Sequence, residues 1–256
     1  MNGPKISAFV LARDEEDRIE SCLRSIAWAD ERIVIVDDKT MDETAAKAAP
    51  LATDVVVHRW EGFSATKRFA CSRTKHPWVL WIDADEVIDA RLAQSIRAAV
   101  ADPSGRAGFR FRRRNYYLGR EIGHGAWSND VVLRLFHRDA GRFDDRIVHE
   151  SAEVDGGTAD LDGFLEHRSY RDLAHHLEKL QVWSKLWTLQ AQESGKRASP
   201  FDLLLRPPTR FVKGYLLKMG FLDGKAGLIL AFMDAAYVGM KYARLLEAQL
   251  SRSRDL

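Results

Sequence analysis

Three carboxylates follow directly after one apolar run in the N-terminal half of the chain. The run Trp78–Ile82 has the length and composition of a strand buried on both faces of a sheet, and it leads into Asp83, Asp85 and Glu86. Open α/β sheets bind ligands in the crevice beyond the carboxyl ends of their strands. Asp83 and Asp85 are two residues apart, so along a strand they point the same way, and they repel unless a cation or a donor-rich ligand lies between them. The pattern predicts Mg²⁺ or Mn²⁺ bound together with substrate phosphates, and the alternative is a solvated turn between strand and helix.

Acidic residues recur at the ends of other predicted strands. Ile6–Ala12 is apolar throughout and precedes a helix with an acidic first turn, and Arg32–Val36 leads into Asp37. A third strand is predicted over Val55–Trp60, with a helix over Ser64–Ser72 after it. Strands and helices that alternate at this spacing predict a parallel, doubly wound sheet. The helix macrodipole explains some of the acids, but their recurrence after three strands predicts a ligand site along one edge of the sheet.

Composition and charge limit the classes of protein that fit. The chain has 256 residues and a formal net charge of +2, and it is long enough to bury a sizeable core. Residues 1–100 carry 14 Lys and Arg against 17 Asp and Glu, whereas residues 196–256 carry 11 against 5. We therefore expect the C-terminal part to face something anionic.

Cys22 and Cys71 lack metal-ligand spacing and are expected to be buried free thiols of a reducing compartment. No signal peptide is recognised, which predicts a cytoplasmic location.

Phosphate binding must rely on something other than a glycine-rich loop. Neither G-x-G-x-x-G nor G-x-x-x-x-G-K-[ST] occurs in the sequence. A nucleotide at the acidic edge would therefore have its phosphates neutralised by a metal ion and by cationic side chains.

A basic segment, Gly108–Tyr117, alternates aromatic residues with arginines. The sequence has no recognisable RNA-binding motif and its net charge is small, so no nucleic acid partner is expected. An acceptor that carries phosphate or carboxylate fits the arginines better. The following Gly123–Trp127 is predicted to be a flexible loop that forms a wall or lid over a donor.

Several segments together resemble the family-2 glycosyltransferases. Residues 37–44 are similar to their D-x-x-S-x-D-x-T segment and residues 83–86 to their D-x-D segment. Shorter motifs narrow the resemblance to lipopolysaccharide inner-core glucosyltransferases and related proteins: Trp60-Glu61-Gly62-Phe63, Arg134-Leu135-Phe136, Val148-His149-Glu150, His167-Arg168-Ser169-Tyr170 and Gly220-Phe221-Leu222-Asp223-Gly224. The ordered set covers nearly the whole chain. It departs from the family at Asp14, where Asn is usual, and at Lys39, Met41 and Glu43, where small residues are usual.

The resemblance implies roles for the acids at matching positions. Asp37 would accept a hydrogen bond from the nucleotide base, expected to be uracil, and Asp14 would contribute to the nucleotide contacts. Asp83 would contact the ribose or the metal shell, and Asp85 would ligate the metal ion that bridges the diphosphate. A divalent cation suits this chemistry because the departing nucleoside diphosphate gains negative charge.

Further residues are candidates for phosphate contact, proton transfer and metal ligation. Lys67 or Arg68 is expected to reach the nucleotide or its phosphates, with a solvated helix face as the alternative. Glu150 is predicted to take the proton of the acceptor hydroxyl in an inverting transfer, with His149 orienting it or touching the acceptor; a surface ion pair is the alternative. His167 is either an ordinary hydrogen-bonded histidine or a third metal ligand that arrives from a C-terminal loop.

The chain beyond residue 170 differs in character. A helix is predicted over Asp172–Gln192, followed by a linker at Gly195–Pro200. The tail then combines basic, aromatic and apolar residues, and Asp234 interrupts an apolar run that would need ~20 residues to span a bilayer. We expect a peripheral position on the inner face of the cytoplasmic membrane, in contact with anionic lipid. Helix–helix packing and a dimer interface are the alternatives.

These expectations combine into one prediction, which rests on the resemblance as well as on the residues. Residues 1–170 form a catalytic α/β domain of the glycosyltransferase-A type, Rossmann-like with a mostly parallel sheet, and residues 171–256 form a helical extension that associates with a membrane or partner. The enzyme moves a hexose from a nucleotide sugar, with UDP-glucose as the expected donor, to a sugar of a lipid-linked glycan such as a lipopolysaccharide core. Transfer to a polyprenyl phosphate and a non-catalytic, membrane-docked nucleotide-sugar binder are the alternatives.

Overall fold

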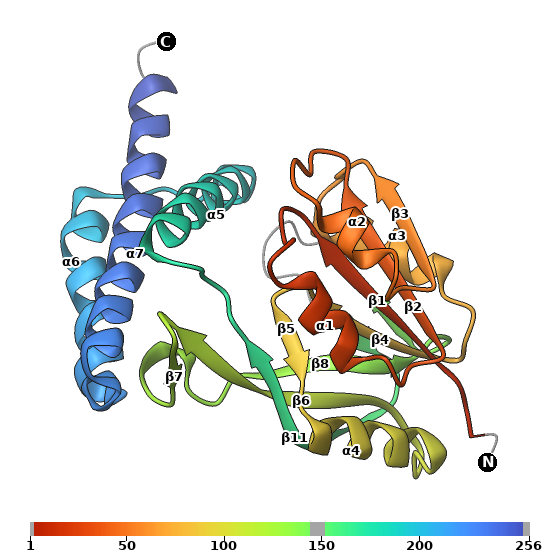
Figure 1. Ribbon diagram of the computed structural model, residues 1–256. Helices are drawn as coiled ribbons and strands as arrows, with labels where there is room; N and C mark the ends of the chain where they lie inside the picture. Colours follow the sequence, from red (N-terminus) through yellow and green to blue (C-terminus); the bar gives the residue numbers. More distant parts are fainter. Residues whose placement is uncertain (1–2, 144–151, 253–256) are drawn as a thin grey trace. The chain divides into compact units, whose positions relative to one another are not determined.

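The computed structural model describes residues 3–143 and 152–252, and the chain divides into two compact units (Figure 1). The first unit comprises residues 1–114 and 129–167, and the second comprises residues 115–128 and 168–256. Residues 115–128 thus group with the C-terminal helices. The two domains predicted over residues 1–170 and 171–256 stay a prediction.

The first unit begins with four parallel strands in the order β3-β2-β1-β4. They are β1 (Ile6–Ala12), β2 (Glu31–Asp37), β3 (Asp54–His58) and β4 (Trp78–Asp83), and the helices between them are α1 (Ile19–Ser25), α2 (Thr44–Ala48) and α3 (Phe63–Arg73). Three of the four predicted strands are correct to within one residue at each end, whereas the third ends two residues earlier than predicted. The predicted alternation is confirmed, because parallel neighbours need a crossover connection and helices supply it here.

The same sheet continues beyond β4 through antiparallel pairs. The order onward from β4 is β8-β6-β11-β5, and β7 pairs with β6. These strands are β5 (Glu86–Ile88), β6 (Arg106–Tyr117), β7 (Arg120–Ile122), β8 (Val131–His137) and β11 (Gly157–His167); β9 (Gly141–Phe143) and β10 (Ala152–Val154) form a separate pair, and α4 (Ala90–Ala101) follows β5. The antiparallel part brings residues from late in the chain next to the end of β4.

Both faces of the parallel strands are covered, which explains their continuous apolar sequence. Successive side chains of a strand point to opposite faces. Val10 of β1 belongs to one core with Ile96 of α4, and Phe9 belongs to the other with Ala70 of α3 and Trp81 of β4. The strands β1, β2 and β4 therefore contribute side chains to two apolar layers.

The second unit is mainly helical. Its elements after residue 168 are α5 (Leu173–Glu193), α6 (Pro200–Val212), the π-helical turn η2 (Lys213–Leu217), the 3₁₀ turn η3 (Gly220–Asp223) and α7 (Gly224–Arg252). Asp172 caps α5 by accepting a hydrogen bond from the His175 amide at 2.8 Å, so the helix predicted over Asp172–Gln192 is confirmed, as is the linker before Pro200. Asp234 lies within the continuous α7, where it pairs with Arg210 of α6 at 3.0 Å. None of the helices in the described ranges is both long enough and apolar enough to cross a bilayer.

Candidate active site

The predicted acids gather at one edge of the sheet. Asp37 is the last residue of β2 and Asp83 is the last residue of β4, and β1 lies between these strands. The register places Leu11 opposite Asp83 and Ala12 opposite Val36. Because β1, β2 and β4 are parallel, their carboxyl ends meet at the same edge, which is where such sheets bind ligands.

Asp14 and Asp37 help to shape the loops at this edge. The buried Asp37 carboxylate accepts a hydrogen bond from the Lys39 amide at 2.9 Å and lies 3.3 Å from Nη1 of Arg13. Asp14 has φ +52°, a left-handed conformation in which Asn and Asp are enriched. Its Oδ1 accepts a hydrogen bond from the Met41 amide at 2.8 Å. An Asn carbonyl oxygen accepts the same bond, so the departure from Asn at this position leaves the loop contact intact.

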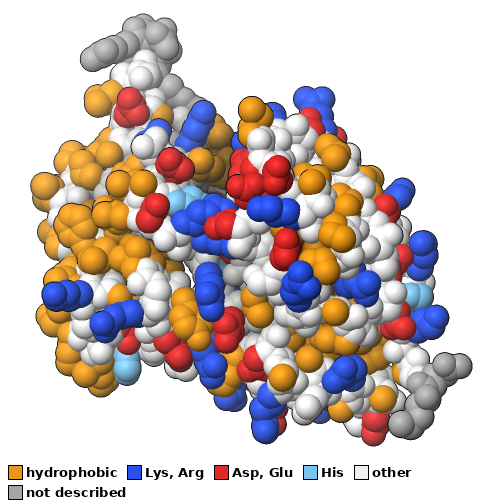
Figure 2. Space-filling view, viewed as in Figure 1, with side chains coloured by type: hydrophobic (Ala, Val, Ile, Leu, Met, Phe, Trp, Pro, Cys, Tyr) orange, Lys and Arg blue, Asp and Glu red, His pale blue; other side chains and the backbone are white. Residues whose placement is uncertain are grey.

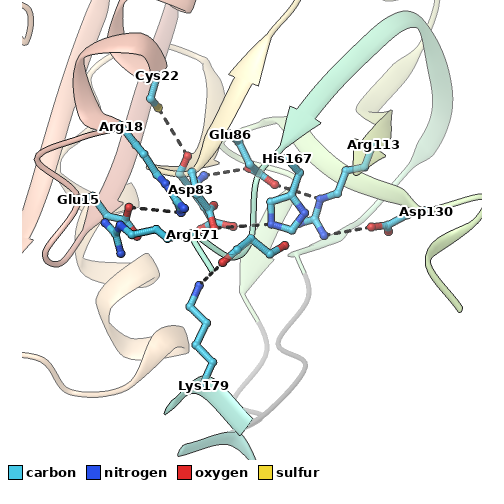
Figure 3. A network of polar contacts seen from close by, with 12 residues as sticks. Glu15, Arg18, Cys22, Asp83, Glu86, Arg113, Asp130, His167, Arg171 and Lys179 are labelled. Atoms are coloured by element: carbon cyan, nitrogen blue, oxygen red, sulfur yellow. Dashed lines mark hydrogen bonds and ion pairs between the residues drawn. The ribbon is translucent and has the colours of Figure 1, made fainter. Parts of the chain in front are cut away.

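Arginines from the antiparallel strands contact Asp83 and Glu86. Figure 3 shows Arg113 between Glu86 and Asp130. Nη2 of Arg134, on β8, lies 2.8 Å from Oδ2 of Asp83 and 2.6 Å from Oε1 of Glu86. The other Glu86 oxygen accepts a hydrogen bond from the Asp83 amide at 2.9 Å. Arg113, on β6, lies 3.0 Å from Glu86 and 3.3 Å from Asp130. Glu86 is completely buried, and its charge is balanced by two guanidinium groups.

Two cations lie over the indole of Trp81. Cζ of Arg134 is 3.6 Å from the centre of a Trp81 ring, and Nζ of Lys67 is 3.9 Å from it. Both cationic side chains are buried, so their charge is felt strongly by nearby groups. Burial favours the neutral form of Asp83, but Arg134, Lys67 and Arg113 outweigh it and hold the pKa of this carboxyl well below its usual range. Asp83 is therefore ionised at neutral pH.

Asp85 and His167 form a second group at the same edge. The last residue of β11, His167, is paired in register with Glu86 of β5, and its Nε2 lies 3.8 Å from Oδ2 of Asp85. Burial lowers the pKa of His167, partly opposed by the Asp85 charge, so the imidazole is neutral and suited to metal ligation.

The donors at this edge fit a metal ion that takes its remaining ligands from elsewhere. Among the described residues, no three His, Cys, Asp or Glu side chains come together as a complete metal site. Mg²⁺ and Mn²⁺ are commonly held by one or two protein ligands together with substrate phosphates and water. Asp85 and His167 are the pair able to act in this way. His167 is the last residue of strand β11. The prediction that it lies on a C-terminal loop was therefore wrong.

The other predicted site residues have different outcomes. Lys67 is buried in α3 and close enough to Asp83 to depress its pKa, so the solvated alternative was wrong for Lys67, while Arg68 is exposed. Glu150 and His149 lie outside the described residues, and their roles stay predictions. The Gly123–Trp127 segment belongs to the second unit and is not a free loop, because Asp223 accepts hydrogen bonds from its backbone.

Sequence reasoning did not assign a role to Arg134, Arg113 or Glu86 in this site. A signal existed for Arg134, which interrupts the apolar run of β8 and has a completely buried side chain. The predicted burial of the cysteines is confirmed for Cys22, whose thiol lies 3.5 Å from the Asp83 carbonyl oxygen, whereas Cys71 is only partly buried.

The fold and the acidic edge define the class of protein. Parallel strands with acids at their carboxyl ends, followed by antiparallel strands that complete the sheet, form a glycosyltransferase-A type fold. Among solved structures, the mannosyltransferase PcManGT from Pyrobaculum calidifontis, in complex with GDP-Man and Mn²⁺, is similar with a TM-score of 0.54. It is 18% identical, and the match covers 96% of this chain and 88% of that one.

Comparisons of sequence identify the family. The model of glycosyl transferase family 2 matches residues 7–149. The lipopolysaccharide core biosynthesis glycosyltransferase LpsC of Rhizobium meliloti (strain 1021) is 30% identical over 256 residues, covering 93% of each chain. The uncharacterized glycosyltransferase RT0209 of Rickettsia typhi is 26% identical, covering 98% of this chain and 90% of its own. The chain belongs to glycosyl transferase family 2, and it is a glycosyltransferase.

Proposed function

We propose that the enzyme moves a hexose from a nucleotide sugar to a sugar of a lipid-linked glycan, with inversion and with a divalent metal ion. UDP-glucose is the proposed donor and a lipopolysaccharide core the proposed acceptor. The observation that carries the proposal is the set of carboxylic acids at the sheet edge, with buried cations that hold the pKa of Asp83 below its usual range. The similarity to a protein named for lipopolysaccharide core biosynthesis supports the acceptor class, and the similarity to a mannosyltransferase in complex with GDP-Man and Mn²⁺ supports a nucleotide sugar and a metal.

Donor binding would divide the acids by function. Asp37 would accept a hydrogen bond from the base and Asp83 from the ribose, with Asp14 shaping the loop between them. Asp85 and His167 would hold Mg²⁺ or Mn²⁺, which neutralises the diphosphate as the sugar leaves. The Nζ of Lys67 lies over the Trp81 ring, and its charge lowers the pKa of Asp83. Lys67 would add positive charge near the phosphates of the donor.

Glu150 would act as the base of an inverting displacement. The acceptor hydroxyl oxygen forms a bond to the anomeric carbon, the bond from that carbon to the diphosphate oxygen breaks, and the hydroxyl proton passes to Glu150. General base catalysis contributes about 10²–10⁴-fold, so Glu150→Gln lowers kcat by that factor while donor binding persists. The rival acceptor, a polyprenyl phosphate, needs no strong base because its oxygen is already ionised. A nearly silent Glu150→Gln would therefore favour the rival.

The proposed location follows from the acceptor and from the helical part of the chain. Residues 1–170 would form the catalytic domain and residues 171–256 a helical extension that meets the membrane. A lipid-linked glycan is made where its lipid is anchored, so the enzyme would work as a peripheral protein on the inner face of the cytoplasmic membrane. Anionic headgroups there would attract the basic C-terminal part.

A thermal-shift panel tests the donor and the metal together. Nucleotide diphosphates and nucleotide sugars are added with Mn²⁺, Mg²⁺ or EDTA. A ligand at 100 times its Kd stabilises the native state by about 2.7 kcal/mol, which raises Tm by about 5–10 °C for a chain of this size. The shift should appear with one nucleotide sugar, vanish with EDTA and vanish in Asp85→Asn, but persist in Asp139→Asn, whose carboxylate is 87% exposed.

Two outcomes would contradict the proposal. No shift with any nucleotide sugar removes its basis and leaves the acids as polar groups at a strand end. A shift without any turnover or hydrolysis of the donor favours the non-catalytic, membrane-docked binder.

A further inference from the structure

Helix α6 turns an apolar stripe toward solvent. Phe201, Leu204, Leu205, Pro208 and Val212 recur at spacings of three, one, three and four residues, which places them on one face of a helix. Phe201 is 71% exposed, Leu204 67% and Leu205 60%, and no α6 residue is buried. An amphipathic helix normally turns such a stripe toward a core. Here the stripe is left outside.

The turn that joins α6 to α7 extends this apolar surface. Leu217, in η2, is 75% exposed, and Leu222, in η3, is 54% exposed. The turn is closely packed. Gly220 and Gly227 lie so close together that a Cβ on Gly227 would come within 2.0 Å of the Gly220 carbonyl oxygen, and the Gly125 amide donates to the Lys218 carbonyl at 2.8 Å. The fold thus exposes the apolar side chains of Leu217 and Leu222 to solvent in a closely packed turn.

The apolar surface carries a net positive charge. Residues 200–222 include four basic residues, Arg206, Arg210, Lys213 and Lys218, and one acid, Asp202. Arg206 pairs with Asp202 and Arg210 pairs with Asp234 of α7. Both lysines are exposed. Figure 2 shows hydrophobic side chains gathered over α6 and α7, with Lys and Arg side chains among them. Exposed apolar patches of this kind on soluble proteins mark interaction sites.

We propose that residues 200–222, here called the docking hairpin, form a monotopic surface that binds a bilayer containing anionic lipid. The apolar stripe enters the boundary between headgroups and acyl chains, and the long lysine side chains reach the phosphates. A second copy of the chain is a poorer occupant, because a twofold contact brings like charges together. The inference rests on the proposed function only for its membrane setting, since lipid binding needs no transferase chemistry.

Flotation with vesicles tests the docking hairpin. The full chain is mixed with vesicles of phosphatidylcholine, with or without phosphatidylglycerol, and the bound fraction is measured. The parent should float with the mixed vesicles. Lys213→Gln with Lys218→Gln should bind them about 25-fold more weakly, because each basic residue near an anionic surface contributes about fivefold, and high salt should reduce binding of the parent.

An apolar pair and its matched control complete the test. Leu217→Gln with Leu222→Gln should lose flotation, whereas Val182→Gln with Leu250→Gln, which are 58% and 65% exposed on α5 and α7, should float like the parent. Flotation of the Leu217 and Leu222 variant at the parent level overturns the inference, as does a parent that never floats. A parent dimer that this variant converts to a monomer, seen by light scattering, would instead assign the surface to a second copy. Donor-induced thermal shifts in the same variants report on the proposed function separately.

Discussion

Replacing Arg134 by methionine is expected to destabilise the first unit by about 3 kcal/mol. Arg134 is completely buried, and its guanidinium group contacts both Asp83 and Glu86 within hydrogen-bond distance. Methionine keeps much of the volume over the Trp81 ring but leaves the carboxylates without this cation.

The magnitude follows from the neighbours that remain. Removing one partner of a buried ion pair costs about 3–5 kcal/mol, because the other charge is left buried. Arg113 still lies 3.0 Å from Glu86, and Lys67 still lowers the pKa of Asp83, so the lower end of the range applies. For a chain of this size the loss corresponds to a fall in Tm of about 6–12 °C.

The pH dependence has a definite sign. In the parent, the pKa of Asp83 is depressed, so the ionised carboxylate contributes stability above its unfolded pKa of about 3.9, and this contribution is lost as the pH falls through the folded-state pKa. Without Arg134 the contribution shrinks. The difference between parent and variant is therefore complete at pH values above about 4, and it narrows only as the pH falls below that value, through the folded-state pKa values.

Urea unfolding followed by circular dichroism at pH 7 and pH 3, which lie on either side of the unfolded Asp pKa of about 3.9, measures both effects. Arg91→Met is the matched control, because Arg91 is 72% exposed and its partner Asp162 is 77% exposed; it should change little. Adding Glu86→Gln to Arg134→Met should cost less than the two single losses summed. A stability loss that is the same at both pH values, or strictly additive losses, would refute the view that Arg134 acts by balancing these carboxylates.

Three further perturbations probe the metal pair and the second unit. His167→Gln should raise the Mn²⁺ concentration needed for half-maximal donor binding about 10–100-fold, measured by titration calorimetry; an unchanged value removes His167 from the ligands. Gly227→Ala should lower Tm, because its Cβ would meet the Gly220 carbonyl oxygen, whereas Gly239→Ala in the same helix, with 3.6 Å of room, should not. Burial, and after it the charge of Lys179, lowers the pKa of His176 to about 4. Below about pH 6.5 the unfolded chain therefore binds a proton that the folded chain does not bind, and the free energy of unfolding should fall by about 2 kcal/mol between pH 7 and pH 5. Urea titrations should show a weaker dependence of this free energy on pH in His176→Gln.

The parallel half of the fold was predictable because its sequence signal is local. A strand buried on both faces reads as an unbroken apolar run, and Ile6–Ala12 and Trp78–Ile82 were located from that signal alone. Acids at the ends of such runs also placed Asp37 and Asp83 at one edge, since parallel strands end on the same side.

The antiparallel half was much less predictable, and the site depends on it. Strand β5 has only three residues, which is too short for any period to be seen. The pairing of His167 with Glu86 is a register between distant segments, and no local pattern encodes it. Lys67 looked like a surface residue because its neighbours along α3 are mixed; it is buried because Trp81, from another element, supplies the ring beneath its charge.

The long-range origin of the arginine network also bears on the order in which the protein acquires its structure. Glu86 and Arg134 are 48 residues apart in the chain, and Asp83 and Arg134 are 51 apart. During synthesis the N-terminal segments emerge first, so the acids of β4 leave the ribosome well before the cation that neutralises them. A nascent chain can pair β1, β2 and β4 early, but burying Glu86 must wait for β8, and placing His167 must wait for β11. The acidic edge is thus the last part of the first unit to mature, and a ribosome that pauses before β8 would hold a chain with a nearly finished sheet and an unfinished site.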